Sequence, residues 1–153
     1  MTNNLPEMTL KAIGIVRNGV KERPPSQGDW WAELVSEIVI DPGLTEALDG
    51  LEGFSHIIVL YWMHRAASGE LLIKVHPRGR KEVPLQGLFA VRTPNRPNPI
   101  GKTTVRLLQR QGNILRVEGL DAIDGTPVID IKPYIPGYDS ATDTRVPKWI
   151  AKR

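Results

Sequence analysis

The segment Arg92–Gly101, RTPNRPNPIG, combines cationic and amide side chains with three prolines. Each proline fixes its own φ angle, lacks an amide donor and pushes the preceding residue into an extended conformation, which predicts a stiff ribbon. Arg92 and Arg96 can each donate paired hydrogen bonds to a carboxylate or a phosphate. Asn95 and Asn98 add donors and acceptors. Since one proline would be enough to protect a sheet edge, we interpret the segment as a binding ribbon.

A second polar cluster follows about thirty residues later. The turn Asp124–Pro127 contains an Asp-Gly pair, which allows a positive φ angle and close approach to a ligand, although such turns are also common between strands. Asp130, Lys132 and Tyr134 alternate along an extended stretch and so share one face. That face could orient an amine nucleophile or stack a base. It could equally hold an internal salt bridge beside a half-buried tyrosine, and the spacing leaves both readings open.

Other chemistry is disfavoured by residues that the sequence lacks or spaces differently. There is no cysteine, which excludes disulfides, thiolate metal sites and cysteine nucleophiles. The three histidines match no compact metal-ligand spacing, so no metal is expected. No catalytic triad motif, phosphate-binding glycine loop or dinucleotide fingerprint occurs, which disfavours hydrolases and phosphotransferases. The longest apolar run, Ile57–Met63, is too short for a membrane span, and the expected location is cytoplasmic.

Positive charge is concentrated in one part of the chain. The net charge is only +3, but Lys74–Arg116 contains ten Lys or Arg residues and one acid, Glu82. This stretch carries +9, so the rest of the chain sums to −6. A basic stretch of this kind can bind phosphate by releasing counterions. It can also be a solvated face that keeps a small protein soluble, and charge alone does not decide between the two.

Short apolar or alternating runs, punctuated by proline and glycine, predict a mainly β protein. We expect one compact domain with a mixed, β-barrel-like sheet, one or two short helices and long loops. Residues 1–8 form a flexible N-terminus, 9–138 the domain and 139–153 a C-terminal tail. One helix is expected at Leu44–Leu48. The expected strands are Leu10–Arg17, Glu33–Ile40, His56–Met63 (central, covered on both faces), Leu85–Arg92, Thr103–Leu108, Ile114–Leu120 and Pro127–Ile131.

Two long blocks, Leu88–Gly101 and Asp124–Tyr134, resemble the signature blocks of the TrmO/YaeB family, also called the TsaA-like domain. Ile13–Arg17 and Leu51–His56, followed by the apolar strand that ends at His64, agree as well. The resemblance extends from about residue 9 to residue 138. It implies a barrel-like homodimer that binds S-adenosylmethionine near the subunit interface. It also implies N6-methylation of threonylcarbamoyl-adenosine next to the tRNA anticodon.

The resemblance also assigns cofactor contacts by position. Arg92 would meet the cofactor carboxylate, and the turn Asp124–Pro127 would offer backbone groups to the adenine or the ribose. The full implied set is Pro25, Ser26, Gln27, His64, Arg65, Arg92, Lys102, Asp124, Gly125, Thr126 and Pro127.

Methyl transfer is an in-line displacement that mainly requires alignment of the amine, so a strong base is not obligatory. Asp130 and Tyr134 are the candidates for orienting the target nitrogen. The tryptophans Trp30, Trp31 and Trp149 are candidates for the dimer contact, or else pack on their own subunit. The expected RNA contacts are Lys74, Arg78, Arg80, Lys81, Arg96 and Asn98.

Two features differ from family members that act on tRNA. Those proteins commonly have an arginine where this sequence has Ser26, and they have a C-terminal extension, whereas this chain stops at Arg153. Two alternatives to a tRNA methyltransferase therefore stay open. One is a methyltransferase for a small molecule, and the other is a non-catalytic nucleic-acid-binding barrel.

Overall fold

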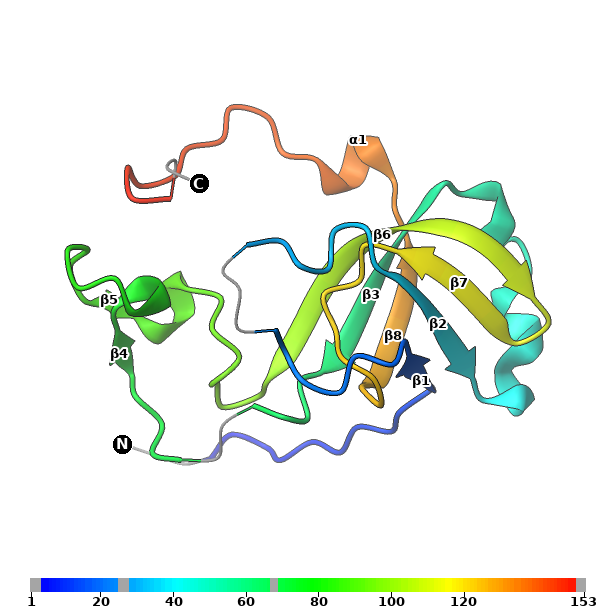
Figure 1. Ribbon diagram of the computed structural model, residues 1–153, viewed down its shortest axis with the longest axis horizontal. Helices are drawn as coiled ribbons and strands as arrows, with labels where there is room; N and C mark the ends of the chain where they lie inside the picture. Colours follow the sequence, from blue (N-terminus) through cyan, green and yellow to red (C-terminus); the bar gives the residue numbers. More distant parts are fainter. Residues whose placement is uncertain (1–3, 25–27, 67–68, 151–153) are drawn as a thin grey trace.

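The structure, a computed structural model, describes residues 4–24, 28–66 and 69–150. Its main feature is a closed barrel of six antiparallel strands in the order β1-β2-β7-β6-β3-β8, with β8 also paired to β1 (Figure 1). The predicted mainly β, barrel-like domain is thereby confirmed. The barrel strands are β1 (Gly14–Arg17), β2 (Val35–Ile40), β3 (His56–Trp62), β6 (Ile100–Gln111), β7 (Ile114–Glu118) and β8 (Pro127–Pro133).

Side-chain alternation explains how the sheet closes around a core. Along β6, Gly101, Thr103 and Val105 are buried, and the residues between them are exposed. This period of two is what a strand with one face in a core requires. On β3, the consecutive residues Ile57–Val59 are all buried, and the strand is hydrogen-bonded to β6 and β8. The prediction that this strand is covered on both faces is therefore confirmed.

The predicted strand Leu85–Arg92 is wrong. Only Gln86–Gly87 (β5) is extended, paired with Lys74–Val75 (β4), and the 3-10 helix η4 (Leu88–Ala90) follows at once. The physical reason is that this stretch has little core to pack against, because Leu88 is buried but Phe89 is 80% exposed. The other predicted strands are present with shifted ends; the strand expected at Thr103–Leu108 occupies all of Ile100–Gln111.

Short helices cover one end of the barrel. The predicted helix Leu44–Leu48 lies within the 3-10 helix η1 (Pro42–Leu48), which the Asp41 carboxylate caps by accepting a hydrogen bond from the Gly43 amide at 3.0 Å. The 3-10 helix η2 (Leu51–Gly53) follows. Arg110 on β6 ties both to the sheet, because its guanidinium contacts the Asp49 carboxylate at 2.9 Å and the Glu52 carboxylate at 3.3 Å. The short helix α1 (Pro136–Asp139) follows β8.

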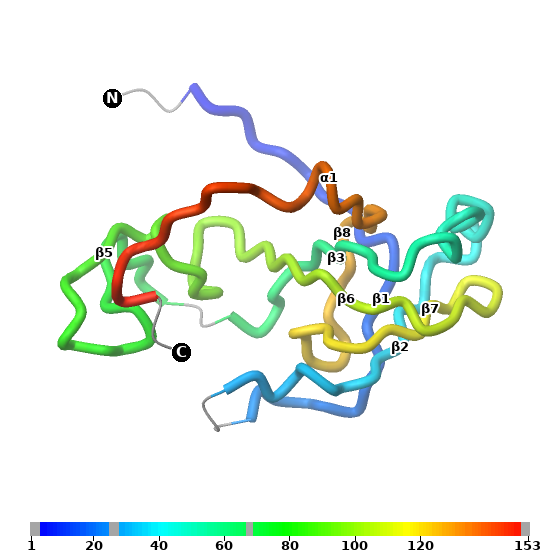
Figure 2. The backbone as a smooth tube through the Cα atoms, turned by 90° about the horizontal axis from the view of Figure 1, so that it is seen from above, coloured from blue at the N-terminus to red at the C-terminus, as the bar shows by residue number. Residues whose placement is uncertain are grey.

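A small lobe, residues 73–91, stands beside the barrel (Figure 1). It contains β4, β5, η4 and the 3-10 helix η3 (Pro77–Gly79). The C-terminal segment runs from α1 back to this lobe, as Figure 2 shows from above, and there the Arg80 guanidinium donates to the Trp149 carbonyl oxygen at 3.3 Å. Across the three described stretches, no helix has the length and apolar character of a membrane span.

Candidate cofactor-binding site

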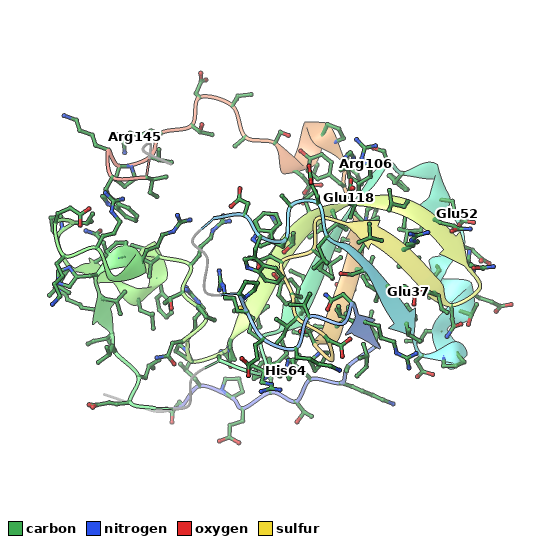
Figure 3. All side chains as sticks on the ribbon, viewed as in Figure 1. Glu37, Glu52, His64, Arg106, Glu118 and Arg145 are labelled. Carbon is green, nitrogen blue, oxygen red and sulfur yellow. The ribbon has the colours of Figure 1, made fainter. Side chains whose placement is uncertain are left out.

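Three of the predicted cofactor regions meet at one end of the barrel. Because β3 and β6 are antiparallel, the end of β3 lies beside the start of β6, with Trp62 opposite Ile100 and Leu60 opposite Lys102. The turn before β8 reaches the same end. A Cβ built on Gly125 would lie 3.8 Å from His64 Nε2. Figure 3 shows His64 at this end. The structure therefore brings together His64, Lys102 and the Asp124–Pro127 turn.

The Asp124–Pro127 turn is held rigidly. Gly125 has a φ angle of 83°, a conformation that glycine adopts without steric cost, and its amide donates to the Val16 carbonyl oxygen at 2.8 Å. The Thr126 hydroxyl is buried and donates to the Ile123 carbonyl oxygen at 2.7 Å. The backbone of the turn is thus fixed before any ligand arrives, which suits a binding surface made of backbone groups.

The Asp124 carboxylate itself is used inside the protein. It accepts hydrogen bonds from the Asn18 amide at 3.0 Å and the Gly19 amide at 3.4 Å, and it pairs with the Lys21 ammonium at 3.3 Å. These contacts, the Asn18 amide first, hold the pKa of Asp124 below its usual range. The Asp124 side chain therefore holds the loop that follows β1. The cofactor contact predicted for Asp124 would have to come from its backbone groups.

A buried polar network lies behind this turn. The Tyr61 hydroxyl, from β3, donates to the Asp121 carbonyl oxygen at 2.9 Å and shares a hydrogen bond of 2.8 Å with the Thr103 hydroxyl, from β6. Tyr61 is 3% exposed, and burial raises its pKa to about 12. A Cβ added at Gly101 would collide with the Tyr61 ring, its Cζ lying 2.6 Å away. The absence of a side chain at Gly101 therefore leaves room for the Tyr61 ring, whose hydroxyl bonds to Thr103 and Asp121.

Asp121 is a candidate for the site that sequence reasoning missed. Its side chain is half-buried, and burial raises the pKa of its carboxyl group, an effect that nearby Arg23 opposes and Asp29 reinforces. Arg23 and Asp29 flank the predicted contacts Pro25, Ser26 and Gln27, which lie outside the described residues. Only the Asp-Gly turn three residues later marked this region in the sequence, and it gave no reason to single out Asp121.

The loop after β1 also carries Trp30. Its indole Nε1 is buried and has no hydrogen-bond partner among the residues that the structure describes. A buried indole N–H usually has a partner, which makes this atom a candidate donor for a ligand. The three tryptophans are each half-buried within their own chain, so their own subunit already covers part of the surface of Trp30, Trp31 and Trp149. Their role in a dimer contact stays a prediction.

The proline-rich ribbon is held by one of its own arginines. The Arg96 guanidinium donates to the carbonyl oxygens of Val91 at 2.6 Å and Thr93 at 3.2 Å, and its central carbon lies 5.8 Å from the centroid of the Phe89 ring. Arg96 therefore orders the ribbon and has fewer donors left for RNA. Arg92 is exposed. The ribbon joins the site at its far end, where the Met63 amide, next to His64, donates to the Pro99 carbonyl oxygen at 2.7 Å.

The remaining predicted RNA contacts are spread over the ribbon and the lobe. Asn98 is exposed at the end of the ribbon. Lys74, Arg78 and Lys81 are exposed on the lobe. Arg80 is engaged there, because its guanidinium pairs with the Glu82 carboxylate at 2.7 Å, which lowers the pKa of Glu82. The lobe thus presents three cations of the predicted set on its surface.

The structure places Tyr134 far from His64, whereas Asp130 lies opposite Leu60, which on its other side pairs with Lys102. Asp130 forms a 3.2 Å ion pair with Lys132, and the Tyr134 hydroxyl shares a 2.7 Å hydrogen bond with Ser140. This matches the reading of an internal salt bridge beside a half-buried tyrosine. The Tyr134 amide bonds to His56, at the start of β3. Six residues at about 3.3 Å each put the start of β3 about 20 Å from its end. Tyr134 and His64 therefore lie at opposite ends of the barrel within one chain.

In residues 4–24, 28–66 and 69–150, no group of three or more His, Cys, Asp or Glu side chains could hold a metal ion.

Comparisons with known proteins identify the family. The family model described as the tRNA-methyltransferase O N-terminal domain matches residues 18–140. A probable S-adenosyl-L-methionine-binding protein of Methanothermobacter thermautotrophicus is 49% identical over 136 residues, covering 88% of this chain and 95% of that protein. The mouse tRNA (adenine(37)-N6)-methyltransferase is 43% identical over 100 residues, covering 65% of this chain and 23% of that one.

Solved structures agree with this assignment. The crystal structure of TrmO from P. aeruginosa matches with a TM-score of 0.76 and 31% identity, covering 97% of this chain. This chain spans 64% of the length of that TrmO chain. A family match that covers most of the chain and a shared barrel fold point the same way. The chain belongs to the tRNA-methyltransferase O family.

Proposed function

We propose that this protein is an S-adenosylmethionine-dependent methyltransferase that methylates N6 of threonylcarbamoyl-adenosine next to the tRNA anticodon. The observation that carries the proposal is the convergence of His64, Lys102 and the Asp124–Pro127 turn at one end of the barrel. Family membership supports the methyl donor, and the mouse relative, named as a tRNA adenine N6-methyltransferase, supports the acceptor. A tRNA acceptor also fits the cytoplasmic location expected from the sequence.

The candidate residues fit the chemistry of the cofactor. S-adenosylmethionine presents an adenine, a ribose, a carboxylate and two cationic groups, and it supplies a methyl group on a positively charged sulfur. The rigid turn at Gly125 offers backbone donors and acceptors with no Cβ in the way. Trp30 offers a buried N–H without a described partner. Exposed Arg92 and Lys102 offer positive charge for a carboxylate.

The chain's own groups have two tasks in this proposal. Arg92 holds the carboxylate end of the cofactor, and the Asp124–Pro127 turn holds its adenine or ribose. The turn, fixed through Val16 and Ile123, provides a support that does not have to rearrange. Holding donor and acceptor in line is the main contribution that a methyltransferase has to make, since alignment alone removes much of the barrier.

Asp130 and Tyr134 remain the proposed orienting residues for the target nitrogen, with one structural condition. Within one chain Tyr134 lies at the start of β3, about 20 Å along the barrel from the strand end that leads to His64, on the strand rise of about 3.3 Å per residue. We therefore propose that Tyr134 acts from the other subunit of the homodimer that the family resemblance implies, whereas Asp130, opposite Leu60 near the end of β3, acts within its own chain.

Positive charge on the lobe supports an RNA acceptor. Lys74, Arg78 and Lys81 are exposed there, and counterion release would make their contribution fall with added salt. A small-molecule acceptor is the second candidate. It is favoured by the internal bonds of Arg80 and Arg96, which remove two of the six predicted RNA contacts.

The acceptor is tested with purified protein, S-adenosylmethionine and tRNA that lacks the modification, followed by mass spectrometry of the nucleosides. We expect a methylated threonylcarbamoyl-adenosine. The double variant Lys74→Ala/Lys81→Ala is expected to bind all tRNA sequences more weakly, and to about the same extent. The slope of the logarithm of its binding constant against the logarithm of salt concentration is expected to be smaller by about two, one for each lost phosphate contact. Lys11→Ala, an exposed lysine outside the lobe, is the matched control. Cofactor binding without any tRNA product would favour the small-molecule candidate.

The cofactor contact is tested by calorimetry. Arg92→Ala is expected to weaken S-adenosylmethionine binding about tenfold or more, because a charge-assisted hydrogen bond is lost. Arg116→Ala, an exposed arginine on β7, serves as the control and is expected to bind as the unmodified protein does. An unchanged affinity in Arg92→Ala would remove Arg92 from the proposed site.

A further inference from the structure

We infer that the Asp121 carboxylate binds the ammonium group of S-adenosylmethionine and so fixes the amino-acid end of the cofactor. The inference rests on the proposed function. It adds a binding residue that lies outside the set implied by the family resemblance.

The backbone around Asp121 is pinned at the end of the barrel where the other candidates meet. Its carbonyl oxygen accepts the Tyr61 hydroxyl at 2.9 Å, and the next carbonyl, of Ala122, accepts the Asn18 amide side chain at 2.8 Å. Tyr61 lies on β3, three residues before His64, which follows the end of the strand, and it pairs opposite Gly101, the neighbour of Lys102. Asp121 is thus fixed among the elements that carry the predicted cofactor contacts.

The side chain of Asp121 contrasts with that of Asp124. Asp124 has three donors around its carboxylate. Asp121 has neither a hydrogen-bond donor nor an ion-pair partner within 4.0 Å among the described residues, although it is half-buried. The charges that act on it from the neighbouring loop have opposite signs, Arg23 attracting and Asp29 repelling its negative charge.

A half-buried carboxylate without a close partner is unfavourable, and a bound cation relieves that cost. The raised pKa of Asp121, caused mainly by burial, agrees with this uncompensated position. The amino-acid end of S-adenosylmethionine carries an ammonium beside its carboxylate. With Arg92 and Lys102 as the cationic candidates for the carboxylate, Asp121 is the anionic complement for the ammonium.

The test compares three ligands on Asp121→Asn by calorimetry. S-adenosylmethionine has the ammonium, the carboxylate and a charged sulfur, S-adenosylhomocysteine keeps the ammonium and the carboxylate on a neutral sulfur, and 5′-methylthioadenosine has a neutral sulfur and neither of the other two groups. We expect the variant to bind the first two about tenfold or more weakly, because a charge-assisted bond is lost. We expect 5′-methylthioadenosine to bind it with less than about a twofold change. Asp143→Asn, an exposed aspartate in the C-terminal segment, is the control.

Two results would overturn the inference. One is an equal weakening of all three ligands, which would indicate a contact with the ribose or a loosened loop. The other is unchanged S-adenosylmethionine binding. If Asp121→Asn does not fold, Asp121→Ser is carried through the same comparison. Unmodified protein that binds none of the three ligands would instead refute the proposed function, so the two failures are distinguishable.

Discussion

The hydroxyl of Tyr61 is expected to stabilise both the barrel and the site. Tyr61→Phe removes one oxygen that serves two groups, the Thr103 hydroxyl at 2.8 Å and the Asp121 carbonyl at 2.9 Å. Because Tyr61 is 3% and Thr103 9% exposed, water does not readily replace the lost oxygen. The variant therefore leaves a carbonyl without its donor and a hydroxyl without its acceptor.

The magnitude follows from these two orphaned groups. Each buried polar group left unpaired costs about 1–3 kcal/mol, so with two such groups Tyr61→Phe should lose roughly 2–6 kcal/mol of unfolding free energy. For a chain of this size, at about 2–4 °C per kcal/mol, that corresponds to a melting temperature lower by about 4–24 °C. Adding Thr103→Val removes the second orphan, so the double variant should lose less than the sum of the two single variants.

The assay is urea unfolding of the four proteins of this double-mutant cycle, with calorimetric melting as a second measure. Tyr61→Phe is also expected to weaken S-adenosylmethionine binding, because the Asp121 carbonyl loses its fixed partner. A loss below about 0.5 kcal/mol, or strictly additive effects of the two substitutions, would refute the reasoning that this hydroxyl orders the site.

Two further predictions concern the same end of the barrel. Gly101→Ala should destabilise the protein by about 1–3 kcal/mol, because the new Cβ collides with the Tyr61 ring. Gly87→Ala, where a Cβ meets no atom within 4 Å, is the control, and equal unfolding midpoints in urea would contradict the prediction. Asp124→Asn should be less stable than the unmodified protein at pH 7. Contacts in the folded state lower the pKa of Asp124, so its contribution is present above the ordinary pKa of 3.8 and is lost as the pH falls through the lowered value. Melting temperatures of both proteins between pH 7 and pH 3 check this, and a gap that stays constant across that range would count against it.

The sequence predicted the barrel better than the lobe. Alternation in β6 and the apolar run of β3 are strong local signals, and both strands are present. The run Leu85–Arg92 resembles a strand by composition, but Phe89 is exposed and only Gln86–Gly87 pairs, because a strand needs a partner that local sequence does not reveal.

The sequence motifs marked the candidate site, but they did not mark the residues that support it. The Asp124–Pro127 turn and His64 meet as the family resemblance implies, whereas Tyr61, Thr103 and Asp121 form their network across 42 and 60 residues of sequence. Such separations leave no periodic pattern to read. Arg96 shows a related limit. Residue type indicated its capacity for paired hydrogen bonds, but only the structure shows them directed to Val91 and Thr93.

The proposed methylation of adenosine in tRNA is tested most directly by mass spectrometry of tRNA nucleosides from cells with the gene, without it, and without it but supplied with the Arg92→Ala variant. We expect that methylated threonylcarbamoyl-adenosine disappears without the gene and is not restored by the variant. An unchanged level of that nucleoside after loss of the gene, in cells with no second methyltransferase of this family, would contradict it.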